Sequence, residues 1–193
     1  MKVLRIDVKQ PERRKLILAG SALKEGKLLV YPTDTVYGIG CAVDSEEVRR
    51  VFEIKGRSQT LPLSIACSDL AMAKEYAEIS AGDETYIRER LFEPYTFIAR
   101  KKDSVPDIVT AGKDTVGIRI PDHPVVKGLV AYAGKPIITT SANLSGKPSP
   151  ASFEEIDEKI ISAVDVAIDS GRCRIGKAST VVDLKTKKIL RTT

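Results

Sequence analysis

Short apolar segments alternate with amphipathic segments along most of the chain. Residues 28–31 and 137–140 are rich in leucine, isoleucine and β-branched residues, and each has the length of a buried strand. Between such runs, apolar residues recur at helical spacing, as in residues 12–25 and 44–55. Strands that alternate with helices pack as an α/β sheet. Several neighbouring strands are joined by short turns, which favours a mixed sheet over an all-parallel one.

The full pattern predicts a sheet of many short strands. Strands are predicted over residues 3–8, 28–31, 63–66, 95–101, 115–120, 136–140, 164–169, 179–184 and 189–191. Helices are predicted over residues 12–25, 44–55, 70–78, 83–91, 123–133 and 152–161. No segment resembles a linker, so residues 1–193 are predicted to form one domain. A chain of this length buries roughly 70% of its extended surface, which is enough for a sizeable core.

Composition narrows the class of protein. Hydrophobic residues make up 42% of the chain and charged residues 30%, as in a folded chain. No apolar run approaches the roughly 18–20 residues of a membrane span, and the N-terminus lacks the apolar core of a signal peptide. With one histidine and three scattered cysteines, neither a zinc site nor a disulfide framework is expected. The sequence therefore predicts a cytoplasmic protein.

Positive charge is concentrated towards the end of the chain. The net charge is +5, and residues 171–193 contain seven basic residues and one acidic residue. Clustered cations indicate a polyanionic partner or a phosphate-bearing substrate. A solvated surface chosen for solubility explains them equally well on this observation alone. Aromatic residues make up only 5% of the chain and tryptophan is absent, which speaks against a base-stacking platform.

Hydroxyl-rich loops follow two of the predicted strands. Residues 31–40 read YPTDTVYGIG, in which Thr33 and Thr35 stand at period two. Residues 139–149 contain five hydroxyl side chains and the amide of Asn143. Loops at the ends of buried strands are where α/β sheets bind ligands, and this composition suits phosphate and ribose groups. For residues 31–40 the pattern alone favours an ordinary turn, and for residues 139–149 a hydrophilic loop is the alternative.

Cations stand beside these loops, whereas strong bases do not. Lys55 and Arg57 end a predicted helix, where they suit its dipole but also form a usual pairing for a triphosphate. Arg119 shares a strand face with Thr115, and an arginine on an inner face needs an anion such as a carboxylate. His123 has no partner serine and is interpreted as structural. These residues predict an enzyme that positions its substrates and stabilises phosphate charge.

Five motifs occur in order: YPTDTVYGIG, KGR, TVGIRIP, TTSANLSGKPS, and STVVD followed by ILR. Together they resemble the YrdC family of threonylcarbamoyl-AMP synthases, in its short single-domain form. The resemblance implies an open, twisted, mixed sheet with flanking helices and a basic concave face. It also implies a nucleotidyltransferase that joins L-threonine, bicarbonate or CO2, and ATP into L-threonylcarbamoyl-AMP and releases pyrophosphate.

The resemblance also assigns candidate site residues by their positions. The implied catalytic residues are Lys55 and Arg57. The implied threonine contacts are Thr35, Arg119, Thr139 and Ser179, with Arg119 on the carboxylate. The implied ATP contacts are Lys55, Arg57, Leu61, Thr115, Ser141, Asn143, Ser149 and Arg191. Magnesium would accompany ATP, without a metal site made by the protein.

The implied product passes to a separate transferase that modifies the adenosine next to the anticodon of tRNAs reading ANN codons. The chain departs from the family pattern at Leu61, where many relatives have a polar residue, and at Ala66, where many have histidine. A function of a different class, a tRNA- or double-stranded-RNA-binding module without catalysis, is the alternative. It predicts an RNA affinity that falls with salt and does not depend on threonine.

Overall fold

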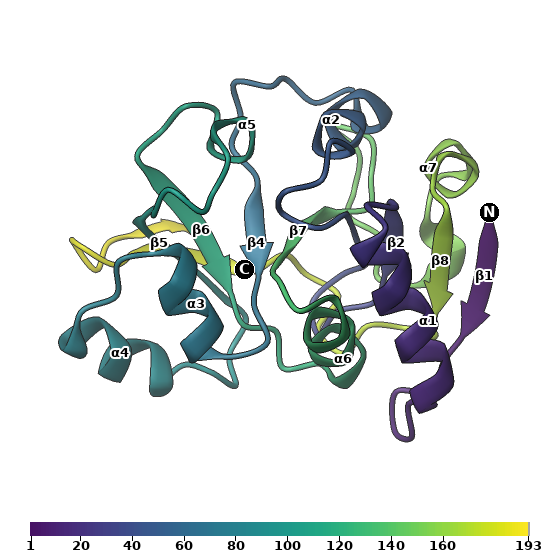
Figure 1. Ribbon diagram of the computed structural model, residues 1–193, viewed down its shortest axis with the longest axis horizontal. Helices are drawn as coiled ribbons and strands as arrows, with labels where there is room; N and C mark the ends of the chain where they lie inside the picture. Colours follow the sequence, from purple (N-terminus) through teal and green to yellow (C-terminus); the bar gives the residue numbers. More distant parts are fainter. Residues whose placement is uncertain (193) are drawn as a thin grey trace.

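Ten strands form one continuous, twisted sheet in the computed structural model, which describes residues 1–192 (Figure 1). The strands are β1 (Lys2–Arg5), β2 (Leu29–Tyr31), β3 (Gly38–Gly40), β4 (Ser64–Ala66), β5 (Tyr95–Arg100), β6 (Thr115–Arg119), β7 (Ile137–Ser141), β8 (Val166–Asp169), β9 (Thr180–Asp183) and β10 (Ile189–Arg191). Their order in the sheet is β1-β8-β2-β3-β7-β4-β6-β5-β9-β10. The predicted domain, residues 1–193, includes Thr193, which lies outside the described residues.

The sheet is mixed, which confirms the predicted fold class. Parallel pairs join β1 to β8, β8 to β2, β4 to β6, and β5 to β9. The other neighbours are antiparallel. The helices are α1 (Arg13–Lys24), α2 (Val48–Lys55), α3 (Leu70–Tyr76), α4 (Ala81–Arg88), α5 (Asp107–Thr110), α6 (Pro124–Ala133) and α7 (Glu158–Ala163), with a 3₁₀ turn, η1 (Phe153–Glu155). None of these is long and apolar enough to cross a membrane.

Three local features differ from the predictions. Residues 38–40, expected within a loop, form β3, because glycine lets this segment lie against β7: a Cβ on Gly40 would come 1.8 Å from the Ile138 carbonyl oxygen. The helix expected over residues 152–161 is broken into η1 and α7. Ile156 is extended between them, and Asp157 begins α7 by accepting a hydrogen bond from the Lys159 amide. The short helix α5 was not predicted.

Two apolar clusters hold helices against the sheet, and neighbouring residues of one strand belong to different clusters. On β2, Leu29 and Tyr31 face the cluster that contains α1 and α6, whereas Val30 faces the cluster that contains α2, α3 and α7. This follows from the period of two along a strand. In the first cluster α1 packs closely on α6, because Gly20 has no side chain: a Cβ there would lie 2.4 Å from Tyr132 Cβ.

Candidate functional site

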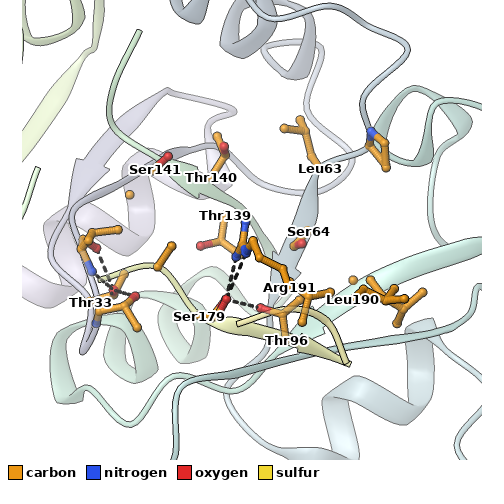
Figure 2. A pocket seen from close by; sticks show the side chains of 18 of the residues that line it. Thr33, Leu63, Ser64, Thr96, Thr139, Thr140, Ser141, Ser179, Leu190 and Arg191 are labelled. Carbon is orange, nitrogen blue, oxygen red and sulfur yellow. Dashed lines mark hydrogen bonds between the residues drawn. The ribbon is translucent and has the colours of Figure 1, made fainter. Parts of the chain in front are cut away.

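A cavity of about 530 Å³ lies on the face of the sheet that α1 and α6 partly cover, next to these two helices along the strands. Hydroxyl side chains from several strands and loops line it, and Figure 2 shows many of them turned into the same space. The lining hydroxyl residues are Thr33, Thr35, Ser64, Thr96, Thr115, Thr139, Thr140, Ser141 and Ser179. The lining charged residues are Arg57, Lys113, Asp183 and Arg191. The cavity is therefore polar, with more positive than negative charge.

The loop between β2 and β3 forms one wall of this cavity through a compact hydrogen-bonded turn. Thr33 Oγ1 accepts hydrogen bonds from the backbone amides of Thr35 and Val36, at 3.0 and 3.2 Å. The same oxygen is 2.7 Å from the Val36 carbonyl oxygen and 2.8 Å from Thr35 Oγ1. The Gly176 amide donates to the Thr35 carbonyl, which ties residues 173–176 to the loop. Side-chain bonding of this kind fixes a loop without regular secondary structure.

Behind this wall lies a buried ion pair. Arg119 Nη2 donates to Asp34 Oδ1 at 2.6 Å, and the two side chains are 8% and 3% exposed. Burial lowers the pKa of Arg119, and the Asp34 carboxylate opposes that shift. The inner-face arginine thus meets a carboxylate, as its sequence position required, but the carboxylate belongs to the protein. Among the described residues no other hydrogen-bond partner of the Arg119 side chain is found, so most of its donors are unused.

Two further arginines reach the cavity from distant parts of the chain. Arg57 follows α2 and donates to the backbone carbonyls of Leu61 and Pro62, at 3.4 and 3.0 Å. Arg191, on β10, donates to the Ser179 carbonyl at 2.7 Å. Burial lowers the pKa of Arg57, and the nearby Arg191 lowers it further. Within the described residues neither guanidinium forms an ion pair, so this end of the cavity favours an anion.

Lys55 lies beside the cavity rather than in its lining. Its ammonium group donates to the carbonyl oxygen of Ser141, and to the carbonyl and side-chain oxygens of Asn143 at 2.7 and 3.3 Å. The side chain of Ser141 donates to the same Asn143 oxygen at 2.5 Å. Burial lowers the pKa of Lys55 to about 8, and Arg57 acts in the same direction. In this arrangement Lys55 fixes the loop that carries Ser141.

Ser179 is held from two sides. Its hydroxyl lies 2.8 Å from Thr96 Oγ1, on the neighbouring strand β5, and both residues are buried. Arg191 binds the carbonyl of Ser179 and lies 3.4 Å from its hydroxyl (Figure 2). The strand pairing of β5 with β9, and of β9 with β10, brings these three residues together.

The structure gathers most, but not all, of the predicted site residues into the cavity lining. Those that line it are Thr35, Arg57, Thr115, Thr139, Ser141, Ser179 and Arg191. Those outside the lining are Lys55, Leu61, Arg119, Asn143 and Ser149. Leu61 is half exposed and directly precedes Pro62, which lines the cavity. Two lining residues that the motifs missed, Ser64 and Thr96, are single hydroxyls within apolar strands, where the period of two was the only available signal.

The described residues contain no alternative centre for catalysis. No group of histidine, cysteine and carboxylate side chains among them could hold a metal ion. Burial lowers the pKa of His123 to about 4, so its imidazole is neutral at pH 7. Burial also raises the pKa of Cys173 to about 11 and that of Cys41 to about 12, which keeps both thiols protonated. The groups that the cavity offers to a bound molecule are its hydroxyls and cations.

Comparison with known proteins decides the family. The model of the Sua5/YciO/YrdC family, described as "Telomere recombination", matches residues 21–193. The chain belongs to the Sua5/YciO/YrdC family. A threonylcarbamoyl-AMP synthase of Pyrococcus abyssi is 38% identical over 90% of this chain, which spans 52% of that protein. A threonylcarbamoyl-AMP synthase of Vibrio vulnificus is 30% identical over 88% of this chain and 94% of its own length.

A solved Sua5/YciO/YrdC structure confirms the fold. The crystal structure of P. abyssi Sua5 complexed with L-threonine superposes with a TM-score of 0.92 at 36% identity. The match covers 99% of this chain and 57% of that one. The chain therefore spans about half the length of this longer relative and nearly all of the Vibrio relative.

Proposed function

We propose that the chain synthesises L-threonylcarbamoyl-AMP from L-threonine, bicarbonate or CO2, and ATP, with release of pyrophosphate. In this proposal it is a nucleotidyltransferase. Its product supplies a separate transferase that modifies the adenosine next to the anticodon of tRNAs reading ANN codons. The names of its relatives support the proposal, as does the threonine bound in the P. abyssi structure. The three free, buried cysteines fit the cytoplasm, which is reducing.

One observation carries the proposal: two arginines without carboxylate partners face a cavity lined by hydroxyls. Burial and the nearby Arg191 lower the pKa of Arg57, and both arginines would gain a counter-ion from a triphosphate. The hydroxyls of Thr115 and Ser141 lie in the same cavity and offer neutral hydrogen bonds to ribose and phosphate oxygens. A cavity of about 530 Å³ falls within the range of sites for small substrates.

Threonine is proposed to bind in the same cavity, near Thr35, Thr139 and Ser179. Arg119 lies on the same face of β6 as Gly117, which lines the cavity. We propose that its unused donors take the threonine carboxylate while Asp34 holds the opposite edge of the guanidinium. The buried pair would then supply a fixed positive group without leaving an isolated buried charge in the empty enzyme.

The proposed reaction needs no protein nucleophile. The threonine amine loses a proton and attacks the carbon of CO2, which gives a carbamate. A carbamate oxygen then attacks the α-phosphorus of ATP, the bond to the oxygen that bridges to the β-phosphorus breaks, and pyrophosphate leaves. Arg57 and Arg191 would offset the negative charge that accumulates on the leaving group. Lys55 would act on this step by holding the Ser141 loop in place.

Magnesium is proposed to enter with ATP as part of the substrate. Asp183 is the one carboxylate among the described residues that line the cavity, and no residue cluster there forms a metal site. This donor set fits an ion that is held mainly by phosphate oxygens and water, as magnesium often is. The ion would reduce the negative charge of the triphosphate.

The test is product analysis after mixing the protein with ATP, magnesium, L-threonine and bicarbonate. Threonylcarbamoyl-AMP is expected by mass spectrometry, and pyrophosphate release is expected only when threonine is present. Arg57→Ala should lower the rate by about 100-fold, because removal of one charge-stabilising donor commonly costs this much. Lys55→Ala should also lose most activity, while both variants still fold, as checked by circular dichroism. Arg14→Ala, at an exposed position on α1, is the matched control.

Two results would contradict the proposal. The first is a protein that binds ATP but forms no threonylcarbamoyl-AMP with all substrates present. Tight, salt-sensitive RNA binding in that same protein would favour the RNA-binding module instead. The second is an Arg57→Ala, Lys55→Ala double variant that releases pyrophosphate at the rate of the parent.

A further inference from the structure

The cavity lining contains a hydroxyl for which no hydrogen-bond partner is found among the described residues. Ser64, on β4, lines the cavity and is partly exposed, and within the described residues its Oγ makes no hydrogen bond. Most of the other hydroxyls that line the cavity already form hydrogen bonds within the protein. Thr35 is bonded to Thr33, Ser179 to Thr96, and Ser141 to Asn143. Ser64 is therefore available to bind a substrate group.

A methyl group lies close to this hydroxyl, and Gly117 explains why. Gly117 is paired with Ser64 across β4 and β6. A Cβ built on Gly117 would lie 2.4 Å from Ser64 Oγ and 3.2 Å from Thr96 Cγ2. Both groups thus converge on the space that glycine leaves open. The hydroxyl of Thr96 is turned towards Ser179, which leaves its methyl group at the cavity floor (Figure 2).

The paired hydroxyl and methyl match one amino-acid side chain. Threonine carries one hydroxyl and one methyl on its β-carbon, so it presents a hydrogen-bonding group and an apolar group in the same small volume. Serine lacks the methyl, and 2-aminobutyrate lacks the hydroxyl. A site that hydrogen-bonds a substrate hydroxyl discriminates strongly against an analogue without it, because its own polar group is then left unpaired.

We propose that Ser64 and Thr96 determine specificity for the amino-acid side chain: Ser64 Oγ binds the β-hydroxyl of threonine, and Thr96 Cγ2 contacts its methyl. This inference rests on the proposed function and assigns two residues that the sequence motifs did not. The position is consistent with the proposed carboxylate contact. Arg119 lies two residues beyond Gly117 on the same strand face, about 7 Å along the strand. The length of the arginine side chain spans that separation.

The test measures binding of L-threonine, L-serine and L-2-aminobutyrate to the whole protein by calorimetry, with ATP binding as a second readout. In Ser64→Ala, threonine affinity should fall roughly tenfold, the size of one neutral hydrogen bond. Affinity for 2-aminobutyrate should stay unchanged, so that the preference for threonine over this analogue disappears. The preference for threonine over serine should remain.

The second variant is designed to give the opposite pattern. Thr96→Ser removes the methyl group but keeps the hydroxyl that is hydrogen-bonded to Ser179. It should therefore lower the affinity for threonine about threefold and leave the affinity for serine unchanged. Its preference for threonine over 2-aminobutyrate should remain. Ser162→Ala, at an exposed position on α7, is the matched control. ATP affinity and melting temperature should not change in any of the three variants.

The outcomes separate the two proposals. If the parent forms threonylcarbamoyl-AMP but Ser64→Ala keeps its affinity and preference for threonine, the assignment of Ser64 is wrong and the proposed function stands. An equal loss of affinity for all three amino acids in Ser64→Ala would also overturn the assignment of Ser64, because that result indicates a general distortion of the cavity. If the parent binds no threonine and forms no product, the proposed function itself is wrong.

Discussion

One face of the sheet has two ends that differ in what covers them. At one end α1 and α6 bury apolar side chains, and at the other a cavity is lined by hydroxyls. The same strands serve both ends. On β4, Ala66 belongs to the covered end and Ser64 to the cavity, and on β7 Ile137 and Thr139 divide in the same way. Residues two apart on a strand share a face. One residue of such a pair can therefore pack against the helices while the other lines the cavity.

The buried pair Arg119–Asp34 lies at the border between the two ends. Arg119 is paired with Ala66 of the covered end, and Gly117, two residues earlier, is paired with Ser64 of the cavity. Both side chains of this ion pair are buried, so each charge is compensated next to the apolar cluster. The covered end is thus packed with apolar side chains, and a buried ion pair lies at the border. At the cavity end, the Ser64 hydroxyl makes no hydrogen bond within the part of the chain that the structure describes.

The largest effect on stability is expected at the border. Asp34→Ala would leave the Arg119 charge buried and unpaired, which should lower the free energy of unfolding by about 3–5 kcal/mol. Chemical denaturation measures this loss. Asp44→Ala, which breaks the exposed pair of Asp44 with Lys135, is the control and should cost at most about 1 kcal/mol. Equal losses in the two variants would mean that Arg119 does not depend on the Asp34 carboxylate as its counter-ion.

A smaller effect is expected at the covered end. Gly20→Ala would force α1 away from α6, because its Cβ would lie 2.4 Å from Tyr132 Cβ. The free energy of unfolding should fall by about 1–3 kcal/mol, as for other overpacked sites, with threonine and ATP affinities unchanged. Gly82→Ala in α4 meets nothing closer than 4.0 Å and should stabilise the protein through helix propensity. A loss of ligand affinity in Gly20→Ala would show that the two ends are coupled.

The smallest effect is an acid sensitivity caused by His123. Burial lowers its pKa to about 4, so between pH 6.5 and 4 the unfolded chain takes up a proton that the folded protein does not. The contribution of His123 to the free energy of unfolding is fully present above pH 6.5 and is lost as the pH falls. Between pH 6.5 and 5 the loss should be about 1–2 kcal/mol. In His123→Gln the melting temperature should fall less over this range, and an identical pH profile would exclude His123 as the cause.

The sequence predicted most of the fold because its strands are short and strongly apolar. The helix ends at Lys55 and Ala133 were predicted to within a residue, since glycine follows each and adopts a left-handed conformation. The strand β3 was missed, because two of its three residues are glycine and carry no hydrophobic pattern. The break between η1 and α7 was also missed, because the apolar spacing continues across it.

The candidate site was predicted where hydroxyls and cations cluster in the chain, and missed where they stand alone. Thr35, Ser141 and Arg57 belong to dense motifs, and all three line the cavity. Ser64 and Thr96 are isolated on apolar strands, so only the pairing of the strands gives them significance. Their proposed role in substrate binding depends on how close they lie to residues on neighbouring strands, and those distances are set only by the tertiary structure.

By itself, the sequence determined the class of fold, the family and the chemical character of the site, because periodicity, loop composition and ordered motifs are local properties of the chain. Only the tertiary structure decided which groups are available. It gave the Arg119 guanidinium a carboxylate from Asp34, turned Lys55 towards the Ser141 loop, and left Ser64 without a hydrogen-bond partner among residues 1–192. These outcomes depend on contacts between residues far apart in the sequence, whose burial and partners are fixed only when the strands pair.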